Sequence, residues 1–420
     1  RRSITGFGRV PGLLRGFLIV NHRTNTVSLK DGTDARPLVQ TLLTPDVLEA
    51  EGDFDVAQRG AGLAPRAAHT RHDKDREECR SPRSLHPHSK ARTGQLRNSN
   101  PALLKSGTMF GSHLSIAGSL INALDQAQTL GLDTVQIFTK NQQQWKAKPL
   151  DSGVVTAWRE RVSTMGWQTR TVSHASYLIN LASPDDELWR KSIDLMTDEI
   201  ERCEALGVPF LVHHPGAFTT STREEGLSRI AKAYTELFKR TPGYATVSCL
   251  ENTVGGGSTI GRTFEELSDL RARIVGGTAH PGRIGFCIDS CHLHAGGYDL
   301  STRKSAEAVL DQLEQVIGAG SVRVLHLNDS KGAMGSRLDR HEHIGRGTIG
   351  EAGFSAILAR SIFRAIPKIM ETPKDDPQGG VAWDTVNLDR LKALAPKASS
   401  DTAGVGGRGA RGTKSRAHGA

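Results

Sequence analysis

The 420-residue chain has no long apolar run and little cysteine, and each shortage excludes a class of protein. Its apolar stretches fall well short of the roughly 20 residues that a membrane-spanning helix needs, so we expect no membrane partner. The five cysteines are too few and too scattered for a disulfide framework: they are Cys79, Cys203, Cys249, Cys287 and Cys291. Reduced thiols in a cytoplasmic protein are therefore the expected state.

The chain is basic overall, but the excess of positive charge lies at its two ends. Of the net charge of +9, residues 1–108 contribute +7 and residues 397–420 contribute +4, which leaves −2 for residues 109–396. A high isoelectric point that arises from the flanks is no evidence that the central segment binds nucleic acid. Any role on DNA has to be argued from the central residues themselves.

The composition divides the chain into three segments. Residues 1–108 show neither strand nor helix periodicity, which predicts a disordered or non-native extension. The pattern changes abruptly at Met109, so we expect the native protein to start at or near this residue. An organelle-targeting peptide is the alternative, because the first twenty residues contain arginine and no acid. Residues 397–420 form a basic Gly/Arg-rich tail, which we expect to be disordered.

Between residues 109 and 396, strand-like runs alternate with amphipathic helical stretches. The predicted strands are residues 109–113, 134–138, 169–174, 209–214, 246–251, 283–289, 323–327 and 366–371. The predicted helices include residues 119–130, 184–206, 223–239, 263–273, 304–317 and 384–394. For the helix at 184–206, Ser183 is placed to cap the start and Gly207 to end it. Eight such units predict an α/β fold, a TIM (β/α)8 barrel, with an open doubly wound sheet as the alternative.

Nine side chains are able to bind a metal, and nearly all of them stand at or just after the ends of these strands. They are His174, His214, Glu251, Asp289, His292, His326, Asp339, His341 and Glu371. Each alone would read as a structural residue, but barrel strands deliver their C-terminal ends to one rim. So many imidazoles and carboxylates could not be satisfied together without cations. The set therefore predicts more than one metal ion, with Zn²⁺ best suited and Mn²⁺ or Fe²⁺ as alternatives.

The ligand set also separates two classes of enzyme that use this barrel. Glu251, Asp289, His326 and Glu371 could form one site of the kind found in single-metal sugar isomerases and epimerases. The remaining members of the set exceed what one ion needs. Three ions that share carboxylates require about this many ligands, so the pattern favours a multinuclear centre.

Eight motifs of the central segment resemble those of one enzyme family. They are GSHLSIAG (111–118), FTKNQQQW (138–145), SHASYLINLASP (173–184), HHPG (213–216), LENTVGGG (250–257), CIDSCHLHAGGYD (287–299), HLNDSKGAMGSRLDRHEHIGRGTIG (326–350) and IMETP (369–373). The chain resembles endonuclease IV, the zinc-dependent apurinic/apyrimidinic (AP) endonuclease family of base-excision repair. The resemblance covers residues 109–395 and neither flank.

The resemblance implies a TIM barrel with three Zn²⁺ ions. Its motif matches assign His174, His214 and Glu251 to the first ion, Glu251, Asp289, His326 and Glu371 to the second, and His292, Asp339 and His341 to the third. In this family, double-stranded DNA is bent, the abasic nucleotide is flipped out, and the phosphodiester on its 5′ side is cleaved. The products are a 3′-hydroxyl and a 5′-deoxyribose phosphate. Glu251 is expected to hold the bridged ions and Glu371 to orient the nucleophile.

The same resemblance suggests DNA contacts at the rim of the barrel. Tyr177 and Leu178 match residues that wedge into the duplex. Gln143 stands where many members have arginine in the motif FTKNQRQW, so this chain lacks that charge. Phosphate-contact candidates, each of which could also be an ordinary solvated side chain, are Lys140, Lys331, Arg337 and Arg340.

The sequence therefore favours an AP endonuclease that acts on double-stranded DNA containing abasic sites. We expect a monomer in the cytoplasm, associated with the nucleoid while it works. The alternative is a single-metal sugar isomerase or epimerase on the same barrel. A third reading is a degenerate barrel that only binds damaged DNA, although a binder would not need the complete ligand set.

Overall fold

The computed structural model describes residues 108–374 and 380–396, together with the backbone of four short strands before them. These strands are β1 (Ser3–Ile4), β2 (Gly16–Asn21), β3 (Thr26–Asp31) and β4 (Thr41–Leu42), paired as an antiparallel sheet in that order. No strand was predicted in this segment. The other predictions for residues 1–107 and for the tail at 397–420 lie outside the described residues.

Eight parallel strands close the barrel. They are β5 (Phe110–His113), β6 (Thr134–Ile137), β7 (Val172–His174), β8 (Phe210–His213), β9 (Val247–Glu251), β10 (Ile284–Asp289), β11 (Val322–His326) and β14 (Lys368–Met370). Each pairs with the next along the chain, and β14 returns to β5 through the register Lys368↔Phe110. The predicted TIM barrel is confirmed, and the open doubly wound sheet is wrong.

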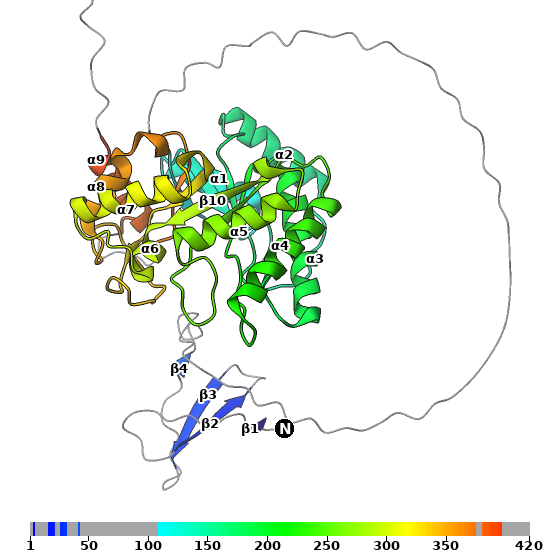
Figure 1. Cartoon of the computed structure of the whole chain (residues 1–420). Coiled ribbons are helices and arrows are strands. Elements are labelled where there is room, and N and C mark those ends of the chain that lie inside the picture. Colours follow the sequence, from blue (N-terminus) through cyan, green and yellow to red (C-terminus); the bar gives the residue numbers. More distant parts are fainter. Residues whose placement is uncertain are drawn as a thin grey trace, which may run out of the picture. The chain divides into compact units, whose positions relative to one another are not determined.

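Helices surround the barrel (Figure 1). They are α1 (Leu120–Thr129), α2 (Ser152–Thr164), α3 (Asp186–Leu206), α4 (Arg223–Arg240), α5 (Phe264–Gly276), α6 (Ser290–Gly296), α7 (Arg303–Val316), α8 (Gly350–Ala359) and α9 (Trp383–Leu394). Their apolar faces and the outward strand residues, such as Val135 and Ile137, form one large core. None of the helices in the described part of the chain has both the length and the apolar character needed to cross a bilayer.

The boundaries of α3 show how local chemistry sets a helix. Asp185 is the N-cap, because its side chain accepts a hydrogen bond of 2.8 Å from the backbone N–H of Leu188. The predicted cap, Ser183, is wrong by two residues, and its hydroxyl instead accepts from the backbone N–H of Asp185. Gly207 ends the helix as predicted, at a left-handed φ of 70° that glycine adopts without strain.

A separate apolar cluster lies inside the barrel. Its members are Val172, Val212, Cys249, Cys287, Val324 and Ile369. Each stands two positions before a predicted ligand, in turn His174, His214, Glu251, Asp289, His326 and Glu371. Residues i and i+2 of a strand point to the same side, so cluster and ligands share the barrel interior. The cluster therefore forms an apolar floor beneath the candidate ligands.

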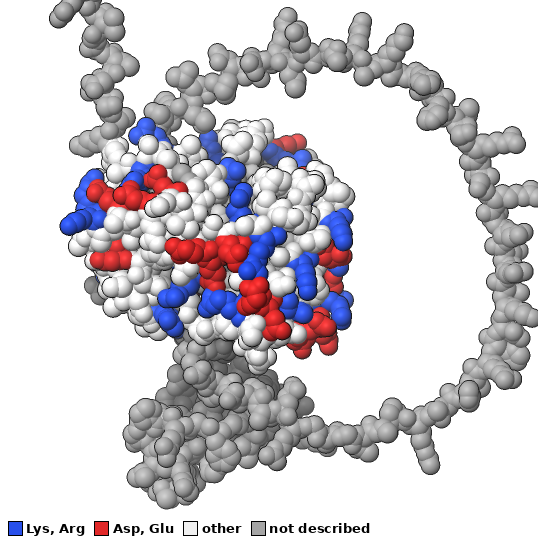
Figure 2. Space-filling view, in the orientation of Figure 1, with Lys and Arg blue, Asp and Glu red and all other residues white. Residues whose placement is uncertain are grey.

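The face of the barrel that holds α4 and α5 carries both signs of charge side by side. Figure 2 shows basic and acidic side chains interspersed on the face that holds α4 and α5. Arg273 of α5 pairs with Glu224 of α4 at 2.5 Å and with Asp269 of its own helix at 2.9 Å. This pairing agrees with the near-neutral charge of residues 109–396 in the sequence.

Candidate metal centre

The barrel brings the predicted ligands together at the C-terminal ends of its strands. His174, Glu251, Asp289 and His326 are the last residues of β7, β9, β10 and β11. Directly after β8 and β14 come His214 and Glu371. Farther along are His292 in α6, Asp339 in a loop, and His341 in the short strand β13 (His341–Glu342). Residues far apart in sequence therefore face one site, as parallel strands in a barrel dictate.

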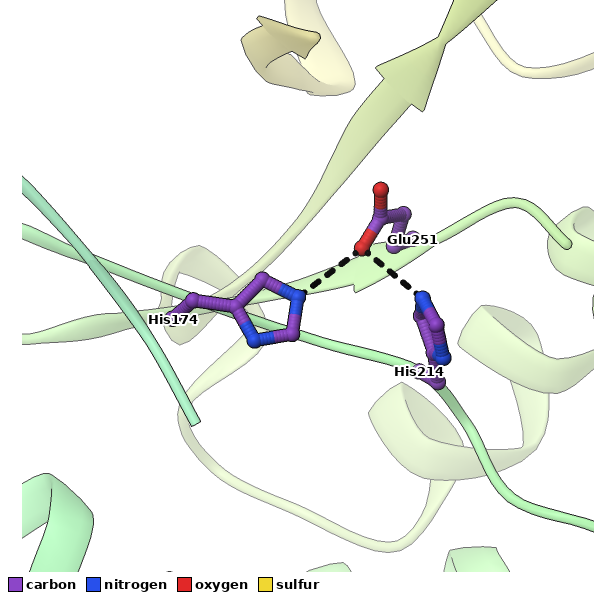
Figure 3. A group of neighbouring side chains, drawn as sticks. All are labelled: His174, His214 and Glu251. Carbon is purple, nitrogen blue, oxygen red and sulfur yellow. Dashed lines mark hydrogen bonds and ion pairs between the residues drawn. The ribbon is translucent and has the colours of Figure 1, made fainter. Parts of the chain in front are cut away.

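His174, His214 and Glu251 form the first group (Figure 3). The Oε2 atom of Glu251 lies 3.2 Å from His174 Nε2 and 3.4 Å from His214 Nε2. Its other oxygen, Oε1, lies 2.8 Å from Nδ1 of His326. The two oxygens of this buried carboxylate thus face two different sets of imidazoles, which is the arrangement that a bridging ligand requires.

The second group joins Glu251 to Asp289, His326 and Glu371, whose candidate ligand atoms all lie within 4.8 Å of one another. His326 stands at its centre, with Nδ1 at 3.1 Å from Glu371 Oε2 and 3.9 Å from Asp289 Oδ2. Three carboxylates crowded around one imidazole repel one another. A divalent cation would offset that repulsion.

The third group is built around Asp339. Its Oδ2 lies 3.1 Å from His292 Nε2, and its Oδ1 lies 3.4 Å from His341 Nε2. Among the described residues, these two buried Nε2 atoms make no hydrogen bond. Asp289 Oδ2 also approaches His341 Nε2, at 3.8 Å. Two buried imidazole nitrogens without hydrogen-bond partners beside carboxylates are a donor set that fits a cation.

The far nitrogens of these imidazoles support the same interpretation. Nδ1 of His174 lies 2.7 Å from the carbonyl of Ala175, and Nδ1 of His292 lies 2.9 Å from that of Asn252. A carbonyl only accepts, so we assign the proton to Nδ1 in both rings. In the neutral form of each ring, Nε2 then presents its lone pair to the site. Metal-binding histidines are commonly oriented in this way.

Burial and ion pairing change the pKa values of the site's side chains in opposite directions. Burial by itself would raise the pKa of Glu251 and Glu371, but the His326 imidazole holds both pKa values well below their usual range. Burial would likewise lower the pKa of His292, but the carboxylates of Asp289 and Asp339 raise it well above the usual value. Without a cation, these ion pairs therefore favour the protonated ring of His292 and the ionised carboxylates of Glu251 and Glu371.

Two further side chains reach the site, and neither was predicted from the sequence. His113 ends β5, and its Nδ1 lies 3.2 Å from Oε1 of Glu371. Gln136 lies in β6 and donates to the same oxygen at 2.6 Å. His113 could have been found, because it ends a predicted strand just as His174 does. Gln136 gives no such signal, because an amide one residue before the end of a strand is unremarkable in a sequence.

Asp329 holds the two ends of the loop that carries Asp339 and His341 by hydrogen bonds to their backbone. This fully buried carboxylate accepts hydrogen bonds from the backbone N–H groups of Ser330, Gly345, Gly347, Ile349 and Gly350. The strand β12 (Asp329–Ser330) also pairs with β13 through Ser330↔His341. These contacts hold the loop against the rim of the barrel.

The candidate DNA-contacting side chains have different surroundings. Tyr177 is 58% exposed, and its ring centre lies 5.0 Å from that of His174. Leu178 beside it is half-buried, whereas Gln143 and Arg340 are exposed. Lys140, by contrast, is buried and forms an ion pair of 3.2 Å with Glu199 of α3. The prediction that Lys140 contacts phosphate is therefore wrong.

A cavity adjoins the first and third groups. Its volume is about 360 Å³, and its lining includes Tyr177, His214, His292 and Asp339. The lining also includes small residues, among them Gly216 and Ala217. The cavity therefore places imidazole and carboxylate groups beside a space that can hold a small polar group.

Comparisons with known proteins agree with this geometry. A family model described as a xylose isomerase-like TIM barrel matches residues 124–394. A probable endonuclease 4 from Trichlorobacter lovleyi is 41% identical over 285 residues, covering 68% of this chain and 99% of the relative. One from Methanoculleus marisnigri is 42% identical over 287 residues, with coverage of 68% and 99%.

Comparison with solved structures distinguishes a relative of the same family from proteins that share only the fold. The crystal structure of endonuclease IV from Thermus thermophilus is 34% identical, with a TM-score of 0.59 and coverage of 68% of this chain and 98% of that one. A D-tagatose 3-epimerase-like protein is 20% identical with a TM-score of 0.51, covers 68% of this chain and 96% of that one, and shows the shared fold alone. Given identities near 40% over almost the whole length of its relatives, the chain belongs to the endonuclease IV family.

Proposed function

We propose that this protein is an AP endonuclease of base-excision repair. It hydrolyses the phosphodiester on the 5′ side of an abasic site in double-stranded DNA and leaves a 3′-hydroxyl and a 5′-deoxyribose phosphate. Family membership supports the reaction class. The observation that carries the proposal is the convergence of three ligand groups in which Glu251 is shared between two.

Three Zn²⁺ ions fit this donor set. The first would be held by His174, His214 and Glu251, the second by Glu251, Asp289, His326 and Glu371, and the third by His292, Asp339 and His341. When bound, the ions would neutralise the phosphodiester and lower the pKa of the attacking water. Mn²⁺ and Fe²⁺ remain chemically compatible with the same ligands.

The two catalytic carboxylates have separate tasks. Glu251 sets the spacing of the first and second groups, because its Oε2 faces His174 and His214 while its Oε1 faces His326. Glu371 orients the attacking water. Its Oε1 is held by Gln136, and its Oε2 is directed toward His326.

Side chains at the rim select the lesion. Tyr177 and Leu178, with Gln143 from the neighbouring loop, fill the space that the abasic nucleotide leaves in the duplex, and Arg340 contacts phosphate. Flipping costs least where a base is already missing, since no pair or stack is lost. The Ser176 hydroxyl donates to the carbonyl of Gln142, so the two loops are joined before DNA arrives. A monomer in the cytoplasm suits this arrangement.

A single-metal sugar isomerase explains less of the structure. It would use the second group only. The buried Nε2 atoms of His292 and His341, which make no hydrogen bond among the described residues, would then have no role. A protein that only binds damaged DNA would need neither the shared carboxylate nor the third group. The AP endonuclease uses all three.

A duplex with one abasic site and a label on the damaged strand tests the proposed reaction. Zinc-supplemented protein should convert it to a shorter strand that ends in a 3′-hydroxyl, which a DNA polymerase can extend. An undamaged duplex of the same sequence is the control and should stay intact. Uncut abasic strands after long incubation would reject the proposed function.

Zinc uptake is expected to release protons and to weaken as the pH falls. In the metal-free protein the pKa values of His292 and His326 lie well above 6.5, so both rings are protonated at neutral pH. They must lose those protons before they donate a lone pair to zinc. Zinc affinity should therefore rise with pH and level off once the pH exceeds the pKa values of these two rings. Adding zinc to weakly buffered metal-free protein at neutral pH should acidify the solution, and an unchanged pH would contradict the prediction.

A further inference from the structure

Gln136 is a neutral amide enclosed among the charged groups of the site. It lies in β6 and is fully buried. Its neighbours Val135 and Ile137 pack in the outer core, so strand alternation turns Gln136 into the barrel. Its side chain makes three polar contacts there, and all three partners belong to the candidate metal centre or touch it.

The amide oxygen of Gln136 fixes one ring of the second group. Oε1 lies 2.8 Å from Nε2 of His326, while Nδ1 of that ring faces Glu251 and Glu371. An amide oxygen can only accept, so the contact requires a proton on Nε2 of His326. In the neutral ring Nδ1 is then unprotonated. That is the nitrogen which has to bind a cation.

The amide nitrogen of Gln136 fixes the carboxylate on the other side. Nε2 donates to Oε1 of Glu371 at 2.6 Å and lies 3.0 Å from Nδ1 of His113. Its two hydrogens therefore have two partners. With Oε1 held in this way, Oε2 of Glu371 is the oxygen left to face His326.

We propose that Gln136 is a positioning residue that selects the cation-binding tautomer of His326, orients Glu371, and so sets the affinity of the second group for its divalent cation. This inference rests on the proposed metal centre. The role needs an acceptor and a donor on one uncharged side chain. Glutamate would repel Glu371, and lysine could not accept from His326.

The tautomer can be tested in the unmodified protein. NMR spectra of zinc-bound protein with ¹⁵N-labelled histidine should show His326 protonated at Nε2 and not at Nδ1. A ring protonated at Nδ1 would overturn the inference. This measurement needs no variant, so it holds even where a substitution at the buried site prevents folding.

The affinity is tested by Gln136→Met, which keeps the side-chain length and removes all three polar contacts. Competition with a zinc chelator should show one ion bound about 10–100-fold more weakly, as for other residues that orient metal ligands, and the other two unchanged. Gln126→Met on the exposed face of α1 is the matched control and should bind as the wild type does. Wild-type affinity in Gln136→Met would overturn the inference.

These experiments use no DNA, so they separate two kinds of failure. Wild-type protein that binds zinc but leaves abasic DNA uncut would reject the proposed function and leave the role of Gln136 intact. If wild-type protein cuts abasic DNA and the Gln136→Met variant keeps its zinc affinity, the proposed function stands and the role of Gln136 is rejected.

Discussion

Replacing Glu251 by glutamine should reduce cleavage of abasic DNA by about 10³-fold or more and release at least one cation from the protein. The first and second groups share this carboxylate, so one substitution weakens both. Glutamine keeps the size of the side chain but removes the charge that His174, His214 and His326 surround. Cleavage rates and elemental analysis of the same preparation measure both effects.

Glu201→Gln is the matched control for this substitution. Glu201 lies on the exposed side of α3, so the change in charge is the same but the site is untouched. Circular dichroism should confirm that both variants are folded. A folded Glu251→Gln variant with the cation content and cleavage rate of Glu201→Gln would show that Glu251 does not bridge two ions.

Replacing Tyr177 by alanine should raise the KM for abasic duplex by about 10- to 100-fold, because stacking of a base on an aromatic ring contributes about 1–3 kcal/mol. The exposed ring of Tyr177 sits beside His174 and His214 at the mouth of the site. It is not a candidate ligand. Hydrolysis of a small chromogenic phosphodiester, which has no duplex to wedge, should therefore be unchanged.

Two comparisons separate stacking from loss of exposed apolar surface. Tyr177→Phe keeps the ring and should retain the wild-type KM. Ile362→Ala removes an exposed apolar side chain just before β14 begins, at the opposite end of the barrel, and should have no effect. An unchanged KM in Tyr177→Ala would remove this residue from the DNA-binding surface.

The fold and the convergence of the candidate ligands at one rim could be predicted because both leave a linear signal. Each barrel strand is a short apolar run, and a ligand such as Glu251 or His326 ends it. Parallel closure then brings these ends together whatever the distance between them in sequence. The apolar cluster beneath the ligands follows from the same two-residue period.

The errors at Lys140 and Gln136 arose because each side chain depends on a distant partner. Lys140 resembles a surface cation in sequence, but Glu199, in a helix far along the chain, buries it in an ion pair. Thr139 and the backbone N–H of Ser176 also donate to Glu199. Gln136 was missed for the same reason, since its importance comes from Glu371, which lies 235 positions away.

Elemental analysis of freshly purified wild-type protein, without added chelator, tests the trinuclear centre most directly. Three divalent cations per folded chain are expected, because three groups of imidazoles and carboxylates meet at the barrel rim. A single tightly held ion that excess zinc cannot increase would contradict the trinuclear centre and favour the isomerase-like alternative.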